Sequence, residues 1–216
     1  MKNKSFTLLA LIVLLFGCKK SDNSYHLHYE VDGHEYDYYI DDFDGLDYET
    51  VERYAAFDIA DDRRSIVALM DSLIDAGTNL RSWWSRYYHA MKETLPPDSI
   101  LPRLLELQER EPSNKLLYGA IGDTYCSLGD TLKGLEYYHR GLDKASDSSD
   151  LWYGFGLITL QQGDTVSAIN SLTKALELAQ RNDIEWRANL IEQILDSIAS
   201  GRSAATDSIS DTHINN

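Results

Sequence analysis

The sequence predicts an all-α fold made of stacked helical hairpins, and three observations support this prediction. The stretch 122-GDTYCSLGDTLKGLEYYHRGL-142 is followed 34 positions later by the similar stretch 156-GLITLQQGDTVSAINSLTKAL-176. Both stretches contain Gly-Asp-Thr, in which the glycine can end one helix and the aspartate can begin the next. Apolar residues also recur at helical spacing in 66–74 and in 188–198.

The offset of 34 residues extends along much of the chain. It pairs aromatic with aromatic, small with small and leucine with leucine: Tyr118 with Trp152 and Trp186, Gly122 with Gly156, Gly134 with Ala168, Gly141 with Ala175, and Leu142 with Leu176. A repeat of this length and pattern resembles the tetratricopeptide repeat (TPR), a helix-turn-helix unit. The resemblance implies a superhelix with a closing helix, because one unit cannot bury its apolar face alone.

The register also predicts the domain organisation. A lipoprotein signal peptide is expected at 1–17, a lipidated, acidic and tyrosine-rich tether at 18–45, the TPR superhelix at 46–199, and a disordered tail at 200–216. The superhelix is divided into the repeats 47–80, 81–114, 115–148 and 149–182 and the closing helix 184–199.

The first two repeats contain recognisable turns. In 47–80, two amphipathic helices are separated at Asp61-Asp62, and Gly77 ends the second. In 81–114, the turn is 95-LPPDS-99, with Ser99 expected to cap a helix at 100–110. Pro102 would then stand in the first turn of that helix, where its missing N–H costs little.

A β-hairpin is predicted within 25-YHLHYEVDGHEYDYYI-40. Two alternating runs flank Asp32-Gly33, a dipeptide typical of two-residue hairpin turns. A lone hairpin is marginally stable in water, so it would pack on the first helices or remain loose.

The first residues predict export. Lys2 and Lys4 precede an apolar run from Phe6 to Phe16 that is too short to span a bilayer. The run ends in 15-LFGC-18, which resembles the lipobox of bacterial lipoproteins, although Phe16 is larger than usual there. The resemblance implies cleavage before Cys18 and acylation of Cys18, with acyl chains such as palmitate. Lys19 in place of an aspartate favours the outer membrane, and the alternative is a plain signal peptide with a chance cysteine.

Charge and motifs exclude several functions. The net charge of −15 argues against a nucleic-acid partner, which needs a basic surface. There is no GxSxG, Walker, HExxH or CxxC motif, so neither an enzyme nor a cofactor is expected. Lipidation of Cys18 would leave Cys126 as a lone, buried cysteine without a disulfide.

The predicted binding site is the concave face, which the first helix of each TPR lines. By the register of the repeat, this face holds Ser85, Arg86, His89, Leu116, Gly119, Asp123, Tyr153, Leu157 and Gln161. The mixed apolar and polar lining suits a helix or an extended peptide, and the Lys/Asn carboxylate clamp of TPR cochaperones is absent. The sequence therefore predicts a scaffold that holds a partner protein or peptide at the bacterial envelope, through a lipid anchor.

Three alternatives remain open at this stage. The acidic segment 21–45 could make the chain a ligand or ion sensor, since 21–62 holds 14 acidic residues and one base, Arg53. A metal could bind side chains near the hairpin, namely His26, His28, Glu30, His34 and Asp37, whereas 41-DDFDGLDYE-49 does not fit an EF-hand. Aromatic side chains could stack on a saccharide or simply pack together, namely Trp83, Trp84, Tyr87 and Tyr88.

Overall fold

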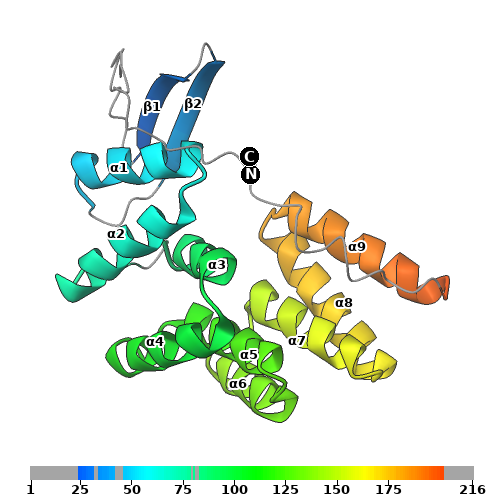
Figure 1. Ribbon diagram of the computed structural model, residues 1–216. Coiled ribbons are helices and arrows are strands. Elements are labelled where there is room, and N and C mark those ends of the chain that lie inside the picture. The colour runs from blue at the N-terminus through cyan, green and yellow to red at the C-terminus, as the bar shows by residue number, and fades with distance from the viewer. Residues whose placement is uncertain (1–23, 32–33, 42–45, 79, 81–82, 202–216) are drawn as a thin grey trace, which may run out of the picture. The chain divides into compact units, whose positions relative to one another are not determined.

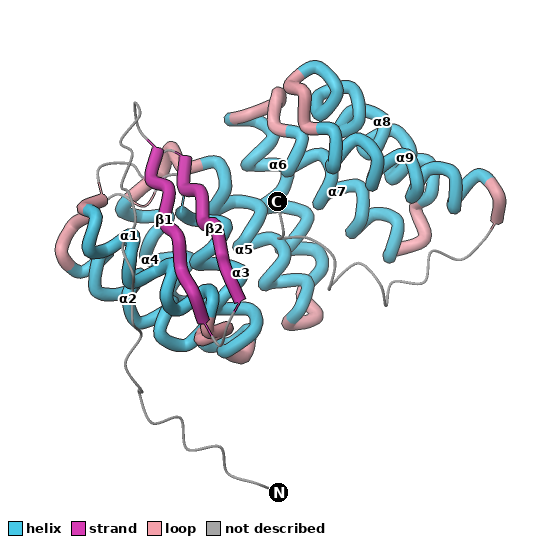
Figure 2. Tube along the Cα trace, turned by 90° about the horizontal axis from the view of Figure 1, so that it is seen from above, coloured by secondary structure: helices cyan, strands magenta, loops and turns pink. Residues whose placement is uncertain are grey.

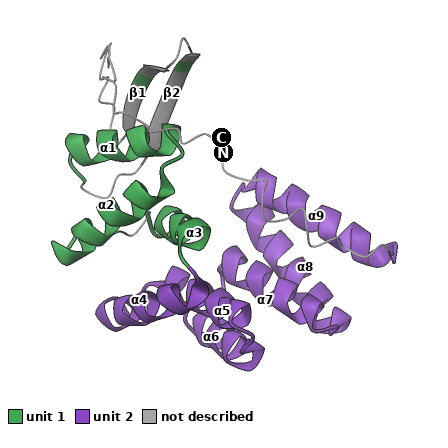
Figure 3. Ribbon diagram, in the orientation of Figure 1, with its two compact units in different colours: residues 1–95 green, residues 96–216 purple. Residues whose placement is uncertain are grey.

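The structure is a computed structural model that describes residues 24–31, 34–41, 46–78, 80 and 83–201. The predicted signal peptide, Cys18 and the predicted tail after 201 lie outside these residues. The chain divides into two compact units, Met1–Leu95 and Pro96–Asn216 (Figure 3). Among the described helices, none has the length and apolar character needed to cross a membrane.

The described part of unit 1 contains one hairpin and three helices (Figure 1). Its elements are β1 (Ser24–Val31), β2 (His34–Asp41), α1 (Tyr48–Ile59), α2 (Arg63–Asp75) and α3 (Trp84–Thr94). The two strands run antiparallel, with Val31 opposite His34, which confirms the predicted hairpin (Figure 2). The turn residues Asp32 and Gly33 are outside the described residues.

The described part of unit 2 is helical throughout, apart from its turns. Its helices are α4 (Pro97–Arg110), α5 (Lys115–Ser127), α6 (Thr131–Lys144), α7 (Ser149–Gln161), α8 (Thr165–Arg181) and α9 (Glu185–Ala199). Along the chain, α5 pairs with α6 and α7 with α8, and α9 packs on α8 as the closing helix.

The 34-residue period is present in the positions of the helices. The second helices of the four repeats, α2, α4, α6 and α8, begin at Arg63, Pro97, Thr131 and Thr165, each 34 residues after the one before. The residue that caps each start recurs with the same period: Asp62, Pro96, Asp130 and Asp164. The fold is therefore all-α and of TPR type, as the sequence predicts.

The Gly-Asp turns have the predicted geometry. Gly129 and Gly163 adopt φ values of 85° and 82°, which L side chains rarely adopt. The carboxylate of Asp130 accepts a hydrogen bond from the backbone N–H of Lys133 at 3.2 Å, and Asp164 caps α8 in the same way. Hydrogen bonds from the backbone and side chain of Lys133 hold the pKa of Asp130 below its usual value, and bonds from the side chain and backbone of Ser167 do the same for Asp164.

The predicted start of α4 is wrong. The helix begins at Pro97 rather than at residue 100, and Ser99 lies inside the first turn, where its N–H donates to the carbonyl of Pro96 at 2.9 Å. Proline suits the first helical position because the N–H there has no helical partner, so Pro97 can start the helix without a side-chain cap. Pro102 consequently stands beyond the first turn, inside the helix.

The core of unit 1 joins its three helices. Val51 and Tyr54 on α1, Met70 on α2, and Trp83 and Trp84 at the start of α3 are all buried. The rings of Tyr54 and Trp83 meet edge to face, with centroids 4.7 Å apart. At the surface, the Arg63 guanidinium pairs with Asp58, Asp61 and Glu93, which ties the start of α2 to α3.

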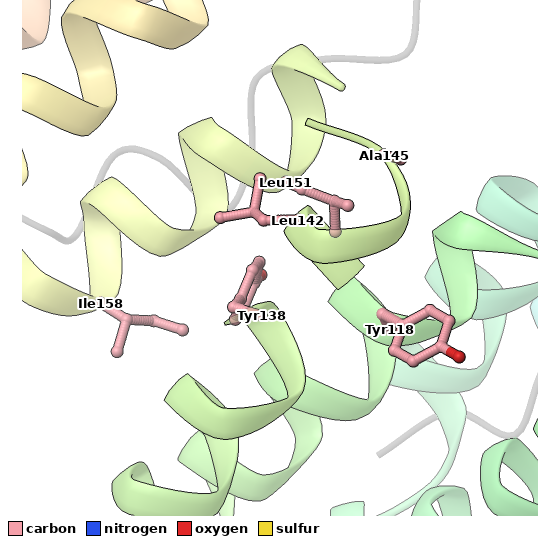
Figure 4. Close-up of a cluster of buried hydrophobic side chains, with 6 residues drawn as sticks. All are labelled: Tyr118, Tyr138, Leu142, Ala145, Leu151 and Ile158. Atoms are coloured by element: carbon pink, nitrogen blue, oxygen red, sulfur yellow. The ribbon is translucent and has the colours of Figure 1, made fainter. Parts of the chain in front are cut away.

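Two apolar clusters lie in the described part of unit 2. The first lies between α5, α6 and α7 and consists of Tyr118, Tyr138, Leu142, Ala145, Leu151 and Ile158 (Figure 4). The second lies between α8 and α9 and consists of Leu172, Ala175, Ile191 and Ile194. Tyr138 and Leu172 therefore face the core, as the repeat register predicts.

Candidate functional site

The predicted binding residues fall into two sets. Arg86 and His89 are on α3 in unit 1, and the other five are in unit 2: Leu116 and Asp123 on α5, and Tyr153, Leu157 and Gln161 on α7. In unit 1, the Arg86 guanidinium lies 5.2 Å from the centre of the Trp83 ring, and Nε2 of His89 is 2.7 Å from the Glu93 carboxylate. We take the five residues in unit 2 as the candidate site.

Asp123 is held in place from the core side. It accepts a hydrogen bond of 2.6 Å from the hydroxyl of Tyr138, whose ring is buried between α5 and α7. Gly154 makes room for this hydroxyl, since a Cβ atom there would lie only 2.2 Å from it. The sequence analysis missed Gly154; the only available signal was that it replaces Ala120 in the repeat alignment.

Tyr153 sits next to a cationic side chain that the sequence analysis also missed. The Arg187 guanidinium, on α9, lies 5.1 Å from the centre of the Tyr153 ring and 4.6 Å from the centre of the Trp186 ring. Its Nη2 atom is 2.6 Å from Oδ1 of Asp150 on α7. We call Asp150, Tyr153, Trp186 and Arg187 the Arg187 cluster.

The electrostatics link Asp123 to this cluster. Burial raises the pKa of the Tyr153 hydroxyl, Arg187 opposes that shift, and the Asp123 carboxylate adds to it. The hydroxyl is therefore protonated at neutral pH and can donate a hydrogen bond. Asp123 on α5, Tyr153 on α7 and Arg187 on α9 consequently provide an acceptor, a neutral donor and a cation on the first helices of the last two repeats and on the closing helix.

Leu157 and Gln161 continue the site along α7. Leu157 is half-buried and packs against the cluster around Leu172 and Ile191, whereas Gln161 is exposed. Leu116, the second residue of α5, is also half-buried. The unit 2 part of the predicted face thus combines partly exposed apolar surface with fixed polar groups, which suits recognition of a peptide.

The structure describes few of the side chains that could bind a metal, and it buries most of the aromatic side chains that could stack on a saccharide. Of the residues predicted near a metal, only His28 has a described side chain, and the described part of the chain holds no group of three metal-ligating residues. Trp83, Trp84 and Tyr87 are buried in unit 1, so they pack together rather than stack on a saccharide. Tyr88 is half-buried beside the Lys92 ammonium group.

Cys126 gives a prediction about pH. Burial raises the pKa of its thiol from 9.0 to about 11, and the carboxylates of Asp123 and Asp130 act in the same direction. The folded chain thus holds this proton more tightly than the unfolded chain, so the stabilisation is complete below pH 9.0 and is lost as the pH rises towards about 11. We expect the free energy of unfolding in urea to fall more between pH 8 and pH 10.5 (roughly the titration range) for wild type than for Cys126→Ser. Equal falls would contradict the prediction.

Comparison with known proteins gives structural neighbours only. No protein-family model and no curated protein sequence matches the chain. Among solved structures, a MamA RS-1 ArsTM double mutant is similar with a TM-score of 0.49 and 19% identity, over 62% of this chain and 75% of that one. MamA MSR-1 C2 has a TM-score of 0.47 and 20% identity, over 65% and 82%. PcrH in complex with the chaperone binding region of PopD has a TM-score of 0.43 and 17% identity, over 74% and 99%.

Proposed function

We propose that this chain is a lipid-anchored, non-catalytic scaffold that holds a partner protein or peptide at the bacterial cell envelope. The anchor is an acylated Cys18, and Lys19 after it favours the outer membrane. The partner binds the first helices of the repeats in unit 2, at Leu116, Asp123, Tyr153, Leu157 and Gln161, whereas Arg86 and His89 belong to the corresponding helix of unit 1.

One observation carries the binding proposal. In unit 2, the Arg187 guanidinium lies over the Tyr153 ring, the Asp123 carboxylate also acts on the Tyr153 hydroxyl, and the half-buried Leu157 packs in the same cluster as Tyr153. A surface of this kind can fix the register of a peptide through its polar groups and bury the peptide's apolar side chains. The support for the anchor is separate and comes from the sequence 15-LFGC-18.

Affinity capture from native membranes tests the binding face. The bait is the full chain, either wild type or with Tyr153→Glu and Leu157→Glu together. We expect one protein to be captured by wild type and lost from the double variant. Docking of an apolar side chain would bury the two new negative charges, which costs free energy.

A surface variant supplies the control. Val166 is 73% exposed, at the second residue of α8, so Val166→Glu adds a charge away from the proposed face and should leave capture unchanged. Circular dichroism and thermal melts would establish that all three chains are folded. Capture of the same proteins by wild type and by the double variant would contradict the proposed face.

A further inference from the structure

We propose that the Arg187 cluster is a subsite for an acidic side chain of the partner, and that Asp150 occupies the Arg187 guanidinium until the partner arrives. The proposal rests on the proposed function, since it names the chemistry of one position in the bound peptide. It is carried by the contacts of Arg187 within the described part of the chain, where Nη2 pairs with Asp150 and the buried Nε has no hydrogen-bond partner.

The guanidinium has more donors than partners. Arginine carries five N–H donors in a planar fork. In the described part of the chain, Nη2 of Arg187 pairs with Asp150, and the buried Nε has no hydrogen-bond partner. A carboxylate that offers two oxygens can bind such a fork with two parallel hydrogen bonds. The ion pair with Asp150 is thus weaker than a contact in which a carboxylate forms two hydrogen bonds with the Arg187 guanidinium.

The rings of Tyr153 and Trp186 hold the Arg187 guanidinium in a position where it can bind a carboxylate. Only 15% of the Arg187 side chain is exposed, and the group lies over both Tyr153 and Trp186. Aromatic neighbours restrict its rotamers and reduce the water around it, so less entropy is lost when a ligand binds. Trp186 itself is 48% exposed, which leaves apolar surface next to the charge for a neighbouring residue of the peptide.

Asp150 can release the guanidinium at low cost. Its side chain is 52% exposed, so water can solvate the carboxylate after release. It also lies in the first turn of α7, where the partial positive charge of the helix N-terminus favours an anion even without Arg187. An incoming carboxylate therefore competes with a partner that is not firmly bound.

The charges nearby favour a carboxylate over a phosphate. Asp123 and Asp150 are the acidic neighbours of the Tyr153–Arg187 pair, and the chain as a whole carries −15. A single negative charge on the ligand is balanced by Arg187, whereas a phosphate dianion would leave one negative charge uncompensated beside two carboxylates. The subsite thus fits aspartate or glutamate.

The test is selection from a displayed library of random 12-residue peptides on the purified full-length chain. Wild type should select peptides with aspartate or glutamate at one position, next to an apolar residue. A selected peptide would then be synthesised with its acidic residue and with the matching amide. We expect wild type to bind the acidic form about tenfold more tightly, as for a charge-assisted hydrogen bond.

Two variants should shift this ratio in opposite directions. Arg187→Met keeps an apolar stem but removes the charge, so the ratio should fall to about one, as expected when the charge-assisted bond is absent. Asp150→Asn removes the competing carboxylate, so the ratio should rise above that of wild type. An Asp150–Arg187 pair with a purely structural role would not give opposite effects. Arg181→Met, at an exposed arginine in the last turn of α8, is the matched control and should leave the ratio unchanged.

The outcomes separate the two proposals. Peptides that bind through Leu157 without acidic enrichment, or acidic enrichment that persists in Arg187→Met, would overturn the subsite and leave the scaffold function standing. If the double variant with Tyr153→Glu and Leu157→Glu still binds every peptide that wild type selects, or if wild type selects none, the binding face itself is overturned. Thermal melts of each variant show whether a change in the ratio of acidic to amide peptide affinity is caused by unfolding of the variant.

Discussion

Gly156→Leu is expected to destabilise unit 2 by about 3 kcal/mol or more, the upper range for overpacked cores. Gly156 is buried in α7, and a Cβ atom there would lie 2.9 Å from Cγ of Leu172 and 3.3 Å from its backbone nitrogen. Leu172 is fully buried and α8 cannot move one atom alone, so a whole leucine side chain has to push the helices apart. Because domains are stable by only about 5–15 kcal/mol, the loss should be plain in urea unfolding.

Two comparisons establish the cause of that loss. Asn170→Leu adds the same side chain to an exposed position of α8 and should change stability by less than about 0.5 kcal/mol. Gly156→Ala and Leu172→Ala act on the same contact from opposite sides, so their combined effect should be smaller than the sum of the two. A variant Gly156→Leu that melts like wild type would show that α7 and α8 are not in this register.

Cys18→Ser is expected to move the protein from the membrane fraction to the soluble fraction. Two or three acyl chains hold a protein firmly on a bilayer, and serine cannot form the thioether to the lipid. Labelling with a palmitate analogue checks the chemistry directly, because wild type should take up the label and the variant should not.

Cys126→Ser is the matched control for this prediction. It removes the other cysteine of the chain but leaves 15-LFGC-18 intact, so both the label and the membrane location should persist. Membrane retention of Cys18→Ser, or labelling of that variant, would contradict anchoring through Cys18.

The helical repeats could be predicted because their signals are local. Turn residues, small residues at helix crossings and the 34-residue offset are all readable from the sequence, and α5 to α8 lie within the repeats 115–148 and 149–182. The predicted start of α4 is wrong because proline at the first helical position replaces a side-chain cap, whereas the sequence pattern favours Ser99 as the cap.

The candidate site was only partly predictable because its contacts join distant positions. Asp123 and Tyr153 follow from the repeat register, whereas their partners depend on packing. Arg187 belongs to a closing helix whose apolar stripe gives no sign of an ion pair with Asp150, 37 positions earlier. The approach of Tyr138 to Asp123 requires a missing side chain at Gly154, and a glycine within a helix has several explanations.

Three of the turns preceding the second helices of the repeats have similar backbone conformations. At the position before each cap, the 34-residue register places Asp61, Leu95, Gly129 and Gly163. Three of these four share a left-handed backbone, with φ values of 54°, 85° and 82°, although one of the three is an aspartate; Leu95, followed by two prolines, has φ −124°. A positive φ at this turn is thus shared by one more repeat than the glycine is. A search for lost copies of such a unit should therefore compare conformations at the turn before it compares letters.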